Sequence, residues 1–337
     1  MVRLSVLDYA QVDEGRTGQE AIADSLRLAQ TAEKLGYHRF WVAEHHNVPA
    51  FASSSPELLM MYILGETQQL RVGSGGVMLP HYSPFKVAEN FRMLEAAHPG
   101  RVDLGYGNTL GTPLVNDALN ETKTGRIAYE KSVRDIYHYL TGSEDETHRF
   151  AGLQANPSGD NLPQMFQLTT SKRGALNAAK AGVGLCFGLF PNASSNKLDV
   201  GREAAEIYRK NFRPSKVMAE PYVMFAPFVV LSEDEAELSG FIQVLDIWLL
   251  GKQDFAEFSA FPSVETAANY KLTPADQEAI EANRTRMITG NAADVKAQLD
   301  RITEHFAADE ILFIPLMPGV HQRQQALELL AEEYGQY

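Results

Sequence analysis

The sequence predicts an α/β protein folded as a (β/α)8 TIM barrel with insertions, on three observations. Short apolar segments alternate with helical segments about eight times along the 337 residues. No repeat or break in composition divides the chain, so we expect a single domain over residues 1–337. A doubly wound open sheet would normally carry a Gly-rich phosphate fingerprint near its first strand, and this sequence has none.

The eight expected strands are short apolar runs that end in turn residues or in polar residues. The third of them is interrupted by glycines at 73, 75 and 76, which favours a bulge or a close approach of backbone. The expected strands lie at residues 3–9, 39–44, 70–79, 102–105, 164–168, 185–190, 222–231 and 310–316.

Each expected helix rests on apolar spacing or on a start or stop signal. The first carries an apolar stripe at helical spacing and is closed by Gly36. Ser55-Pro56 and Ser83-Pro84 open the next two, because Ser can cap a helix and Pro fits its first turn. The expected helices lie at residues 19–35, from 55 onward, 83–97, 124–140, 172–181, 198–212, 232–249, 293–306 and 322–334.

Two segments lack a clear helical or strand pattern and are interpreted as insertions. Residues 147–163 are rich in Pro, Gly and Asn, which favours a hairpin or a loop. Residues 250–275 are irregular and contain Phe255, Phe258 and Phe261. These aromatic residues are expected to form a small satellite cluster, with a cover over a substrate as the alternative.

The composition is that of an acidic globular protein, and it argues against two kinds of partner. A net charge of −13 without a run of Lys or Arg argues against nucleic acid. No apolar run approaches the roughly 18 residues of a membrane span, and no basic leader precedes the first strand. We therefore expect no membrane partner and a cytoplasmic location. The single cysteine, Cys186, lies in an apolar run and is interpreted as a core thiol.

The segment Glu44-His45-His46 is the strongest candidate for chemistry. It follows a buried apolar run, and α/β barrels place their active sites at the carboxyl ends of the strands. Histidine is also the side chain best able to exchange a proton near neutral pH. Adjacent side chains point opposite ways, so at most one imidazole should touch a given substrate atom. No metal site is expected, because the His-Glu-x-x-His spacing of zinc enzymes is missing.

Residues that follow the other strands should gather at the same face of the barrel. Gly75 and Gly76 near the end of the third strand indicate either tight packing or bare backbone against a flat ligand. Asn108 follows the fourth strand. The residues expected to line a substrate pocket are Tyr9, Glu44, His46 and Tyr106.

The segment Thr169-Thr170-Ser171-Lys172 precedes an expected helix and is a candidate phosphate site. Free backbone N–H groups and the positive end of a helix dipole suit an anion, and Lys172 adds charge. An ordinary N-cap with solvated bases is the alternative.

Three stretches of sequence resemble a known family. They are Trp-Val-Ala-Glu-His-His-Asn at 41–47, Arg-Val-Gly-Ser-Gly-Gly-Val-Met-Leu-Pro at 71–80, and His-Pro-Gly-Arg-Val-Asp-Leu-Gly at 98–105. Together they resemble the bacterial luciferase-like flavin monooxygenases. The resemblance is most specific over about the first 112 residues and continues collinearly through 164–182 and from 288 to the last strand.

The resemblance implies a barrel that is usually a homodimer and binds reduced FMN supplied by a separate flavin reductase. It implies O2 as a second substrate and His45 as the base or proton donor of the pocket. A non-proline cis peptide beneath the flavin ring would fall at Gly75-Gly76. The phosphate-binding turn of the family would fall on Thr170 and Ser171.

One departure from the family pattern concerns the flavin phosphate. Close relatives usually have Gly-Arg-Ala-Pro-Gly after the fourth strand, whereas residues 107–111 here are Gly-Asn-Thr-Leu-Gly. Asn108 can donate a hydrogen bond but supplies no charge, which costs on the order of 1.5–3 kcal/mol of cofactor affinity. Lys172, where relatives often have Gly, could restore a charge from another direction.

The leading hypothesis is an FMN-dependent monooxygenase that oxidises a small organic substrate with O2. Ser171, Thr170 and Lys172 would hold the phosphate, Gly75 and Gly76 would back the ring, and His45 would transfer a proton. Two alternatives stay open: a non-catalytic relative that binds flavin or another ligand, and an oxidoreductase that uses the deazaflavin F420. The sequence does not identify the substrate.

Overall fold

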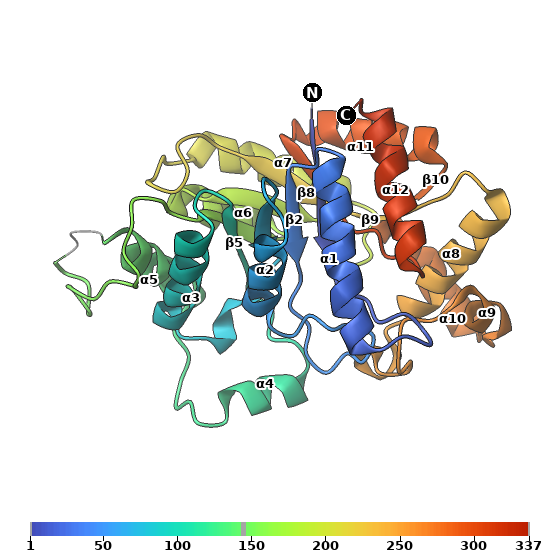
Figure 1. Cartoon of the computed structure of the whole chain (residues 1–337), viewed down its shortest axis with the longest axis horizontal. Helices are drawn as coiled ribbons and strands as arrows, with labels where there is room; N and C mark the ends of the chain where they lie inside the picture. The colour runs from blue at the N-terminus through green and yellow to red at the C-terminus, as the bar shows by residue number, and fades with distance from the viewer. Residues whose placement is uncertain (1, 143–145, 336–337) are drawn as a thin grey trace.

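The computed structural model describes residues 2–142 and 146–335, and its centre is a closed barrel of eight parallel strands (Figure 1). Each strand pairs with its neighbour in a parallel register, and the pairing of β3 with β5 closes the ring. The predicted (β/α)8 barrel is therefore confirmed. Around the ring the strands are β1 Arg3–Asp8, β2 Arg39–Val42, β3 Arg71–Ser74, β5 Val102–Gly107, β6 Gln164–Thr169, β7 Gly184–Gly188, β8 Val223–Ala226 and β11 Glu310–Phe313.

Helices surround the barrel, and several begin at the caps that their sequences offer. Thr17 and Glu20 form a capping box at the start of α1, and Ser171 caps α6. Ser55 and Ser83 precede α2 and α3 as expected, but neither side chain makes a capping hydrogen bond. The helices are α1 Gly18–Lys34, α2 Pro56–Gly65, α3 Pro84–Ala97, α4 Pro113–Asn120, α5 Tyr129–Thr141, α6 Lys172–Ala181, α7 Lys197–Asn211, α8 Glu235–Trp248, α9 Val264–Asn269, α10 Pro274–Asn283, α11 Ala292–Phe306 and α12 Val320–Glu333.

The prediction of one long strand over 222–231 was wrong. The segment divides at Pro227 into β8 and β9 (Phe228–Leu231), because proline has no N–H to donate to a ladder. β9 leaves the barrel and pairs in parallel with β10 (Met287–Gly290), a strand that the sequence analysis did not predict. The expected strand 70–79 likewise divides at Gly75-Gly76 into β3 and β4 (Val77–Met78).

The expected helix over 124–140 begins later, at Tyr129, and the separate short helix α4 precedes it. The segment 147–163 forms turns and bends without a hairpin, and 250–275 contains α9 as well as irregular turns. Figure 1 shows the start of β1 and the end of α12 toward one end of the molecule and α4 at the opposite end. No helix in the described ranges is both long and apolar enough to cross a membrane.

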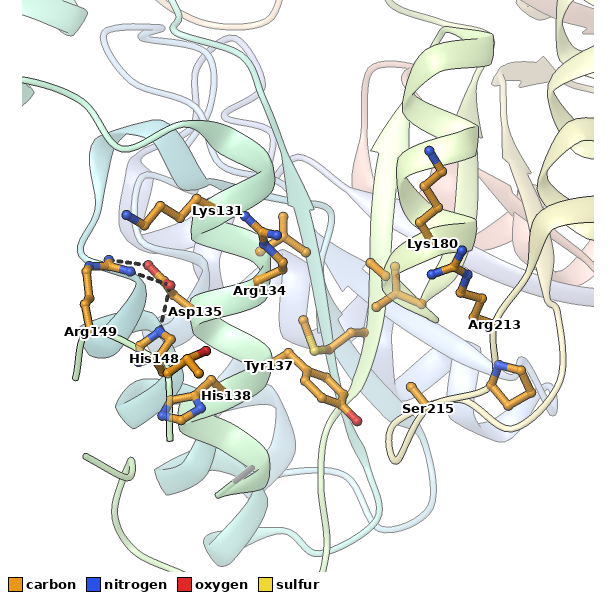
Figure 2. A pocket seen from close by; sticks show the side chains of 16 residues that line it. Lys131, Arg134, Asp135, Tyr137, His138, His148, Arg149, Lys180, Arg213 and Ser215 are labelled. Carbon is orange, nitrogen blue, oxygen red and sulfur yellow. Dashed lines mark hydrogen bonds and ion pairs between the residues drawn. The ribbon is translucent and has the colours of Figure 1, made fainter. Parts of the chain in front are cut away.

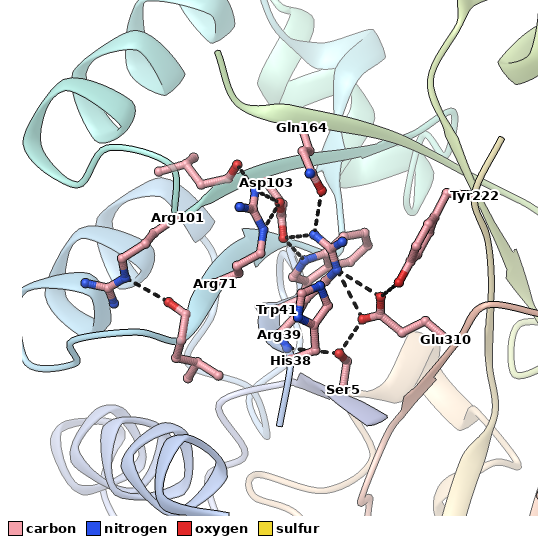
Figure 3. Close-up of polar contacts among 12 residues, drawn as sticks. Ser5, His38, Arg39, Trp41, Arg71, Arg101, Asp103, Gln164, Tyr222 and Glu310 are labelled. Carbon is pink, nitrogen blue, oxygen red and sulfur yellow. Dashed lines mark hydrogen bonds and ion pairs between the residues drawn. The ribbon is translucent and has the colours of Figure 1, made fainter. Parts of the chain in front are cut away.

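A buried ionic network fills the barrel at the amino ends of its strands (Figure 3). Arg39 lies between two carboxylates, with its Nη1 2.7 Å from Asp103 and its Nε 3.0 Å from Glu310. Trp41 Nε1 donates to Asp103 at 3.0 Å, and the Tyr222 hydroxyl donates to Glu310 at 2.5 Å. Because these side chains close this end of the barrel, a ligand that enters the barrel itself would do so at the carboxyl ends of the strands.

Candidate active site

Two adjoining cavities lie at the carboxyl ends of the strands. The first, of about 480 Å³, has a floor of bare glycine backbone and is called here the glycine chamber. The second, of about 460 Å³, is called the aromatic chamber because its lining includes Tyr9, Phe51, Phe190, Phe228, Trp248 and Phe255. The two chambers share part of their lining. The shared residues are Tyr9, Glu44, His45, Met78, Thr109, Phe190 and Pro191.

His45 borders both chambers, directly after β2. Its backbone N–H donates to the carbonyl of Ser53 at 2.9 Å, and its ring packs against both Tyr9 and Phe51 at centroid distances of 4.5 and 4.8 Å. Its Nδ1 is buried and has no hydrogen-bond partner among the described residues. Burial, together with the nearby His46, lowers the pKa of His45 from 6.5 to about 4. The ring is therefore neutral at pH 7.

Glu44 points to the other side of this segment and is fully engaged. Its Oε2 accepts the N–H of Met78 at 2.8 Å, and its Oε1 accepts the hydroxyl of Tyr82 at 2.6 Å. His46 Nε2 lies 2.7 Å from the same Oε1. The expected opposite orientation of the two histidines is confirmed, since His46 joins Glu44 while His45 packs on Tyr9. Glu44 fixes the segment after β4 rather than presenting a free carboxylate.

Gly75 and Gly76 form the floor of the glycine chamber, and the peptide bond between them is cis, as the resemblance implied. A Cβ built on Gly76 would lie 2.8 Å from the carbonyl oxygen of Gly105, and one on Gly75 would lie 2.5 Å from Leu7 Cδ1. A side chain at Gly76 would meet backbone, and one at Gly75 would meet the side chains of Leu7 and Trp41. The interpretation of tight packing is therefore confirmed, and the interpretation of bare backbone against a flat ligand stays a prediction.

The turn from β6 to α6 forms the far end of the glycine chamber. Ser171 Oγ accepts the N–H of Gly174 at 3.1 Å and caps the helix. The amides of the first helical turn at 172 and 173 have no acceptor within the helix, and the helix dipole places partial positive charge there. The predicted cofactor residues that line this chamber are Gly75, Gly76, Asn108, Thr170 and Ser171.

Two predicted site residues lie elsewhere. Lys172 is exposed and pairs with Glu203 at 2.8 Å, and it does not line the glycine chamber. No Lys or Arg is among the described residues that line this chamber. Tyr106 is fully buried on the outer side of β5, with its ring 6.3 Å from that of Tyr129 in α5, and it lines neither chamber.

The sequence analysis missed most of the aromatic chamber. Phe51, Phe228 and Trp248 line it, as does Arg286 just before β10. Phe255 both lines this chamber and belongs to a cluster around Trp248, with the two ring centroids 5.4 Å apart. The apolar spacing of the flanking elements could have indicated buried rings, but not which cavity they face.

Cys186 is buried, as expected for a core thiol, and burial raises its pKa. It also forms part of the glycine-chamber wall.

Another cavity, of about 660 Å³, lies on the outside of the barrel beside α5 and α6 (Figure 2). Asp135 contacts two basic side chains in the lining of this cavity. It accepts a hydrogen bond from Arg149 Nη1 at 2.8 Å and lies 2.9 Å from His148 Nε2. None of the residues that the sequence singled out for chemistry lines this cavity. We therefore assign the candidate site to the two chambers at the carboxyl ends of the strands.

The comparison with known families agrees with this architecture. Residues 2–334 match the family described as luciferase-like monooxygenase. The chain belongs to the luciferase-like monooxygenase family. It is 37% identical over 334 residues to the protein YceB of Bacillus subtilis (strain 168), covering 98% of this chain and 99% of YceB. It is 34% identical over 335 residues to the N-acetyl-S-alkylcysteine monooxygenase of the same strain, covering 98% of each chain.

Solved structures of luciferase-like enzymes share the fold. Apo-MsnO8 has a TM-score of 0.84 at 29% identity, covering 100% of this chain and 99% of MsnO8. The oxygenating component of 3,6-diketocamphane monooxygenase from Pseudomonas putida, in complex with FMN, has a TM-score of 0.67 at 16% identity, with 99% and 98% covered. An F420-dependent secondary alcohol dehydrogenase has a TM-score of 0.63 at 15% identity, with 98% and 97% covered. The neighbours thus include both FMN-dependent monooxygenases and F420-dependent enzymes.

Proposed function

We propose that this protein is a two-component monooxygenase that binds reduced FMN and oxidises a small organic substrate with O2. The observation that carries the proposal is the meeting of two chambers at His45. One chamber has a bare backbone floor and ends at the start of a helix, and the other is lined by aromatic rings. A flat cofactor with a phosphate suits the first, and an apolar substrate suits the second.

The glycine chamber fits FMN by its donor set as well as by its floor. The isoalloxazine ring would lie against the bare backbone of Gly75 and Gly76, which lines this chamber. The phosphate would be held by Thr170, Ser171 and the first amides of α6, with Asn108 as a further donor. When bound, reduced FMN supplies two electrons to O2, so that one oxygen atom enters the substrate and the other leaves as water.

The residues of this chain would contribute positioning, water exclusion and one proton-transfer group. His45 is neutral at pH 7 and has a free Nδ1, so it can accept a proton or a hydrogen bond beside the reacting atoms. Glu44 holds Met78 and Tyr82 in place and thereby shapes the boundary between the chambers. The rings of Phe51, Phe228 and Trp248 keep water away from the substrate side.

The relative named N-acetyl-S-alkylcysteine monooxygenase supports a thioether as the substrate. A thioether has an apolar arm, which the aromatic chamber suits, and a sulfur that can accept one oxygen atom. The chamber of about 460 Å³ is within the range of sites for small ligands.

F420 receives less support than FMN from the same chamber. F420 carries a phosphodiester and carboxylates, and no Lys or Arg lines the described part of the glycine chamber to meet them. A protein that binds flavin without turnover would share all the binding features, so only an activity measurement separates it from the proposed enzyme.

The test is an oxygenation assay. The protein is supplied with FMN, NADH, a flavin reductase and benzyl methyl sulfide under 18O2, and the sulfoxide is analysed by mass spectrometry. Protein-dependent sulfoxide that contains one 18O atom is the expected result. Flavin binding without oxygen transfer would favour the non-catalytic alternative. Reduction of F420 with no FMN binding would favour the F420-dependent oxidoreductase.

We also propose a homodimer that contacts its reductase only transiently. Light scattering coupled to size-exclusion chromatography tests both parts. The expected result is a mass twice 37.3 kDa, with no stable complex when the reductase is added. A monomer, or a stable complex of the two proteins, would contradict this proposal.

A further inference from the structure

Arg286 is a cation that borders the aromatic chamber without a carboxylate partner. Its Nε donates to the carbonyl of Phe190 at 2.5 Å, and its Nη1 donates to Asn283 Oδ1 at 3.0 Å. The guanidinium carbon lies 5.8 Å from the centre of the Phe228 ring. No carboxylate in the described ranges lies within ion-pair distance of it, and Nη2 has no partner there.

Two other buried guanidinium groups of this protein pair with carboxylates, whereas the guanidinium of Arg92 meets only backbone carbonyls. Arg39 lies between Asp103 and Glu310, and Arg323 lies 3.1 Å from Asp13. A partly buried cation without an anion is unfavourable, and burial lowers the pKa of Arg286. A bound ligand with negative charge would complete this site, because a guanidinium binds a carboxylate through two parallel hydrogen bonds.

Tyr9 supplies a second donor near the same position. Its side chain is only 6% exposed, it borders both chambers, and its hydroxyl has no hydrogen-bond partner among the described residues. Arg286 lies near enough to act electrostatically on the Tyr9 hydroxyl. The Tyr9 hydroxyl and the Nη2 of Arg286, both without an acceptor at the wall of one chamber, point to an anionic group on a ligand.

Two acidic residues also border the aromatic chamber, and neither neutralises Arg286. The Glu44 carboxylate is occupied by Met78, Tyr82 and His46. Asp254 is exposed at the rim and has no ion pair with Arg286. Of the two charges at this chamber without an ion pair, Asp254 is exposed to solvent, whereas Arg286 is partly buried.

We propose that Arg286, assisted by the hydroxyl of Tyr9, binds the carboxylate of the substrate. The substrate class is then a monocarboxylic acid whose apolar thioether arm packs against Phe51, Trp248 and Phe255. This inference rests on the proposed function for the thioether, but the charge of the ligand follows from the chamber itself. Arg286 acts in specificity, since it selects the acid over neutral compounds of the same shape.

The test uses 3-(benzylthio)propanoate and the corresponding amide, which has a similar shape and no charge. Both are titrated calorimetrically into the wild-type protein, Arg286→Met and Arg301→Met, without flavin and again with FMN. Arg301 is the matched control, because it is exposed on α11 and does not border the aromatic chamber. Its replacement causes the same change in net charge.

We expect the wild type to bind the acid at least about tenfold more tightly than the amide. Arg286→Met should remove this preference while still binding the amide within about threefold of wild type, which also shows that the variant is folded. Arg301→Met should keep the preference. Equal binding of acid and amide by the wild type, an unchanged preference in Arg286→Met, or no binding of either compound would overturn the inference.

Parallel titration with FMN separates this inference from the proposed function. Loss of acid binding in Arg286→Met without any FMN binding by the wild type would leave the anion site intact and contradict only the monooxygenase proposal. Normal FMN binding together with unchanged acid binding in Arg286→Met would contradict only the anion site.

Discussion

At the scale of single residues, burial and partners decide what neighbouring side chains of similar chemistry can do. Glu44, His45 and His46 are consecutive, yet Glu44 and His46 are tied to each other while His45 is buried with a free nitrogen. The sequence could identify the motif and the alternation of its side chains. It could not show which of their polar atoms are hydrogen-bonded and which are not. The partners of Glu44 and His45 come from distant segments, namely β4, Tyr82 after the 3-10 turn, and the loop at 51–53.

His45→Ala should lower turnover on the order of 100-fold and leave the affinity for reduced FMN within about threefold. The imidazole is the proton-transfer group, and losing such a group commonly costs this much. Stopped-flow turnover and an anaerobic flavin titration measure the two quantities. His321→Ala, at an exposed position, is the control. Turnover equal to wild type in His45→Ala would remove this residue from the mechanism.

The low pKa of His45 also predicts how stability depends on pH. The unfolded chain binds a proton at His45 near pH 6.5, whereas the folded protein binds it only near pH 4. Between these values the unfolded state holds more protons, so the free energy of unfolding should fall as the pH falls from 6.5 to 4. Burial lowers the pKa of His38 to about 4 as well, so both residues contribute.

Urea denaturation at pH 7.5 and pH 4.5 measures this dependence. His45→Gln should show a smaller loss of unfolding free energy between the two pH values than the wild type, because one of the contributing imidazoles is gone. An identical loss in variant and wild type would show that His45 is protonated normally in the folded protein.

At the scale of elements, the candidate cofactor site is made where strands end and helices begin. The β6–α6 turn contributes hydroxyls and free amides, and β5 ends at a segment where Asn108 lines the same chamber. Lys172 begins α6, but its side chain pairs with Glu203. An element boundary thus predicts the position of a backbone amide more securely than the direction of a long side chain.

Asn108→Arg should increase the affinity for reduced FMN about tenfold or more. An arginine at this position would add charge-assisted hydrogen bonds to a phosphate in a chamber that has no Lys or Arg among its described lining residues. Anaerobic fluorescence titration measures the change. Lys172→Met is the companion variant, and its FMN affinity should stay within about threefold of wild type. A large loss of affinity in Lys172→Met would contradict the present assignment of the phosphate site.

At the scale of the whole molecule, the ionic network around Arg39 closes the barrel at the amino ends of its strands. The two chambers lie at the carboxyl ends. The alternation of strand and helix was sufficient to predict the barrel. The split at Pro227, the pairing of β9 with β10 and the ionic network were not predicted, because they depend on contacts between distant segments. Arg39 and Glu310, for example, are 271 positions apart. Arg286 was missed for the same reason, since it enters the site from the 3-10 turn Arg284–Arg286 just before β10, a strand that the sequence analysis did not predict.

Asp103→Asn should lower the free energy of unfolding by about 3–5 kcal/mol, because it leaves the buried Arg39 with one carboxylate fewer. Burial alone would raise the pKa of Asp103, but Arg39 and Arg71 outweigh it and lower the pKa below 3.8. The stabilisation is therefore present above that pH and is lost as the pH falls through the lowered pKa.

Chemical denaturation at pH 7 compares Asp103→Asn with Glu206→Gln, which breaks the exposed pair of Arg202 and Glu206. The control should change stability by less than about 1 kcal/mol. Equal, small effects of the two substitutions would mean that the network does not stabilise the closed end of the barrel.

The central claim is that the glycine chamber binds reduced FMN with its phosphate at the start of α6. The most direct test compares the anaerobic binding of reduced FMN with that of reduced riboflavin, which lacks only the phosphate. We predict that FMN binds at least about tenfold more tightly than riboflavin, through the amides of α6 and the hydroxyls of Thr170 and Ser171. Equal affinities for the two flavins, or no binding of either, would contradict this account.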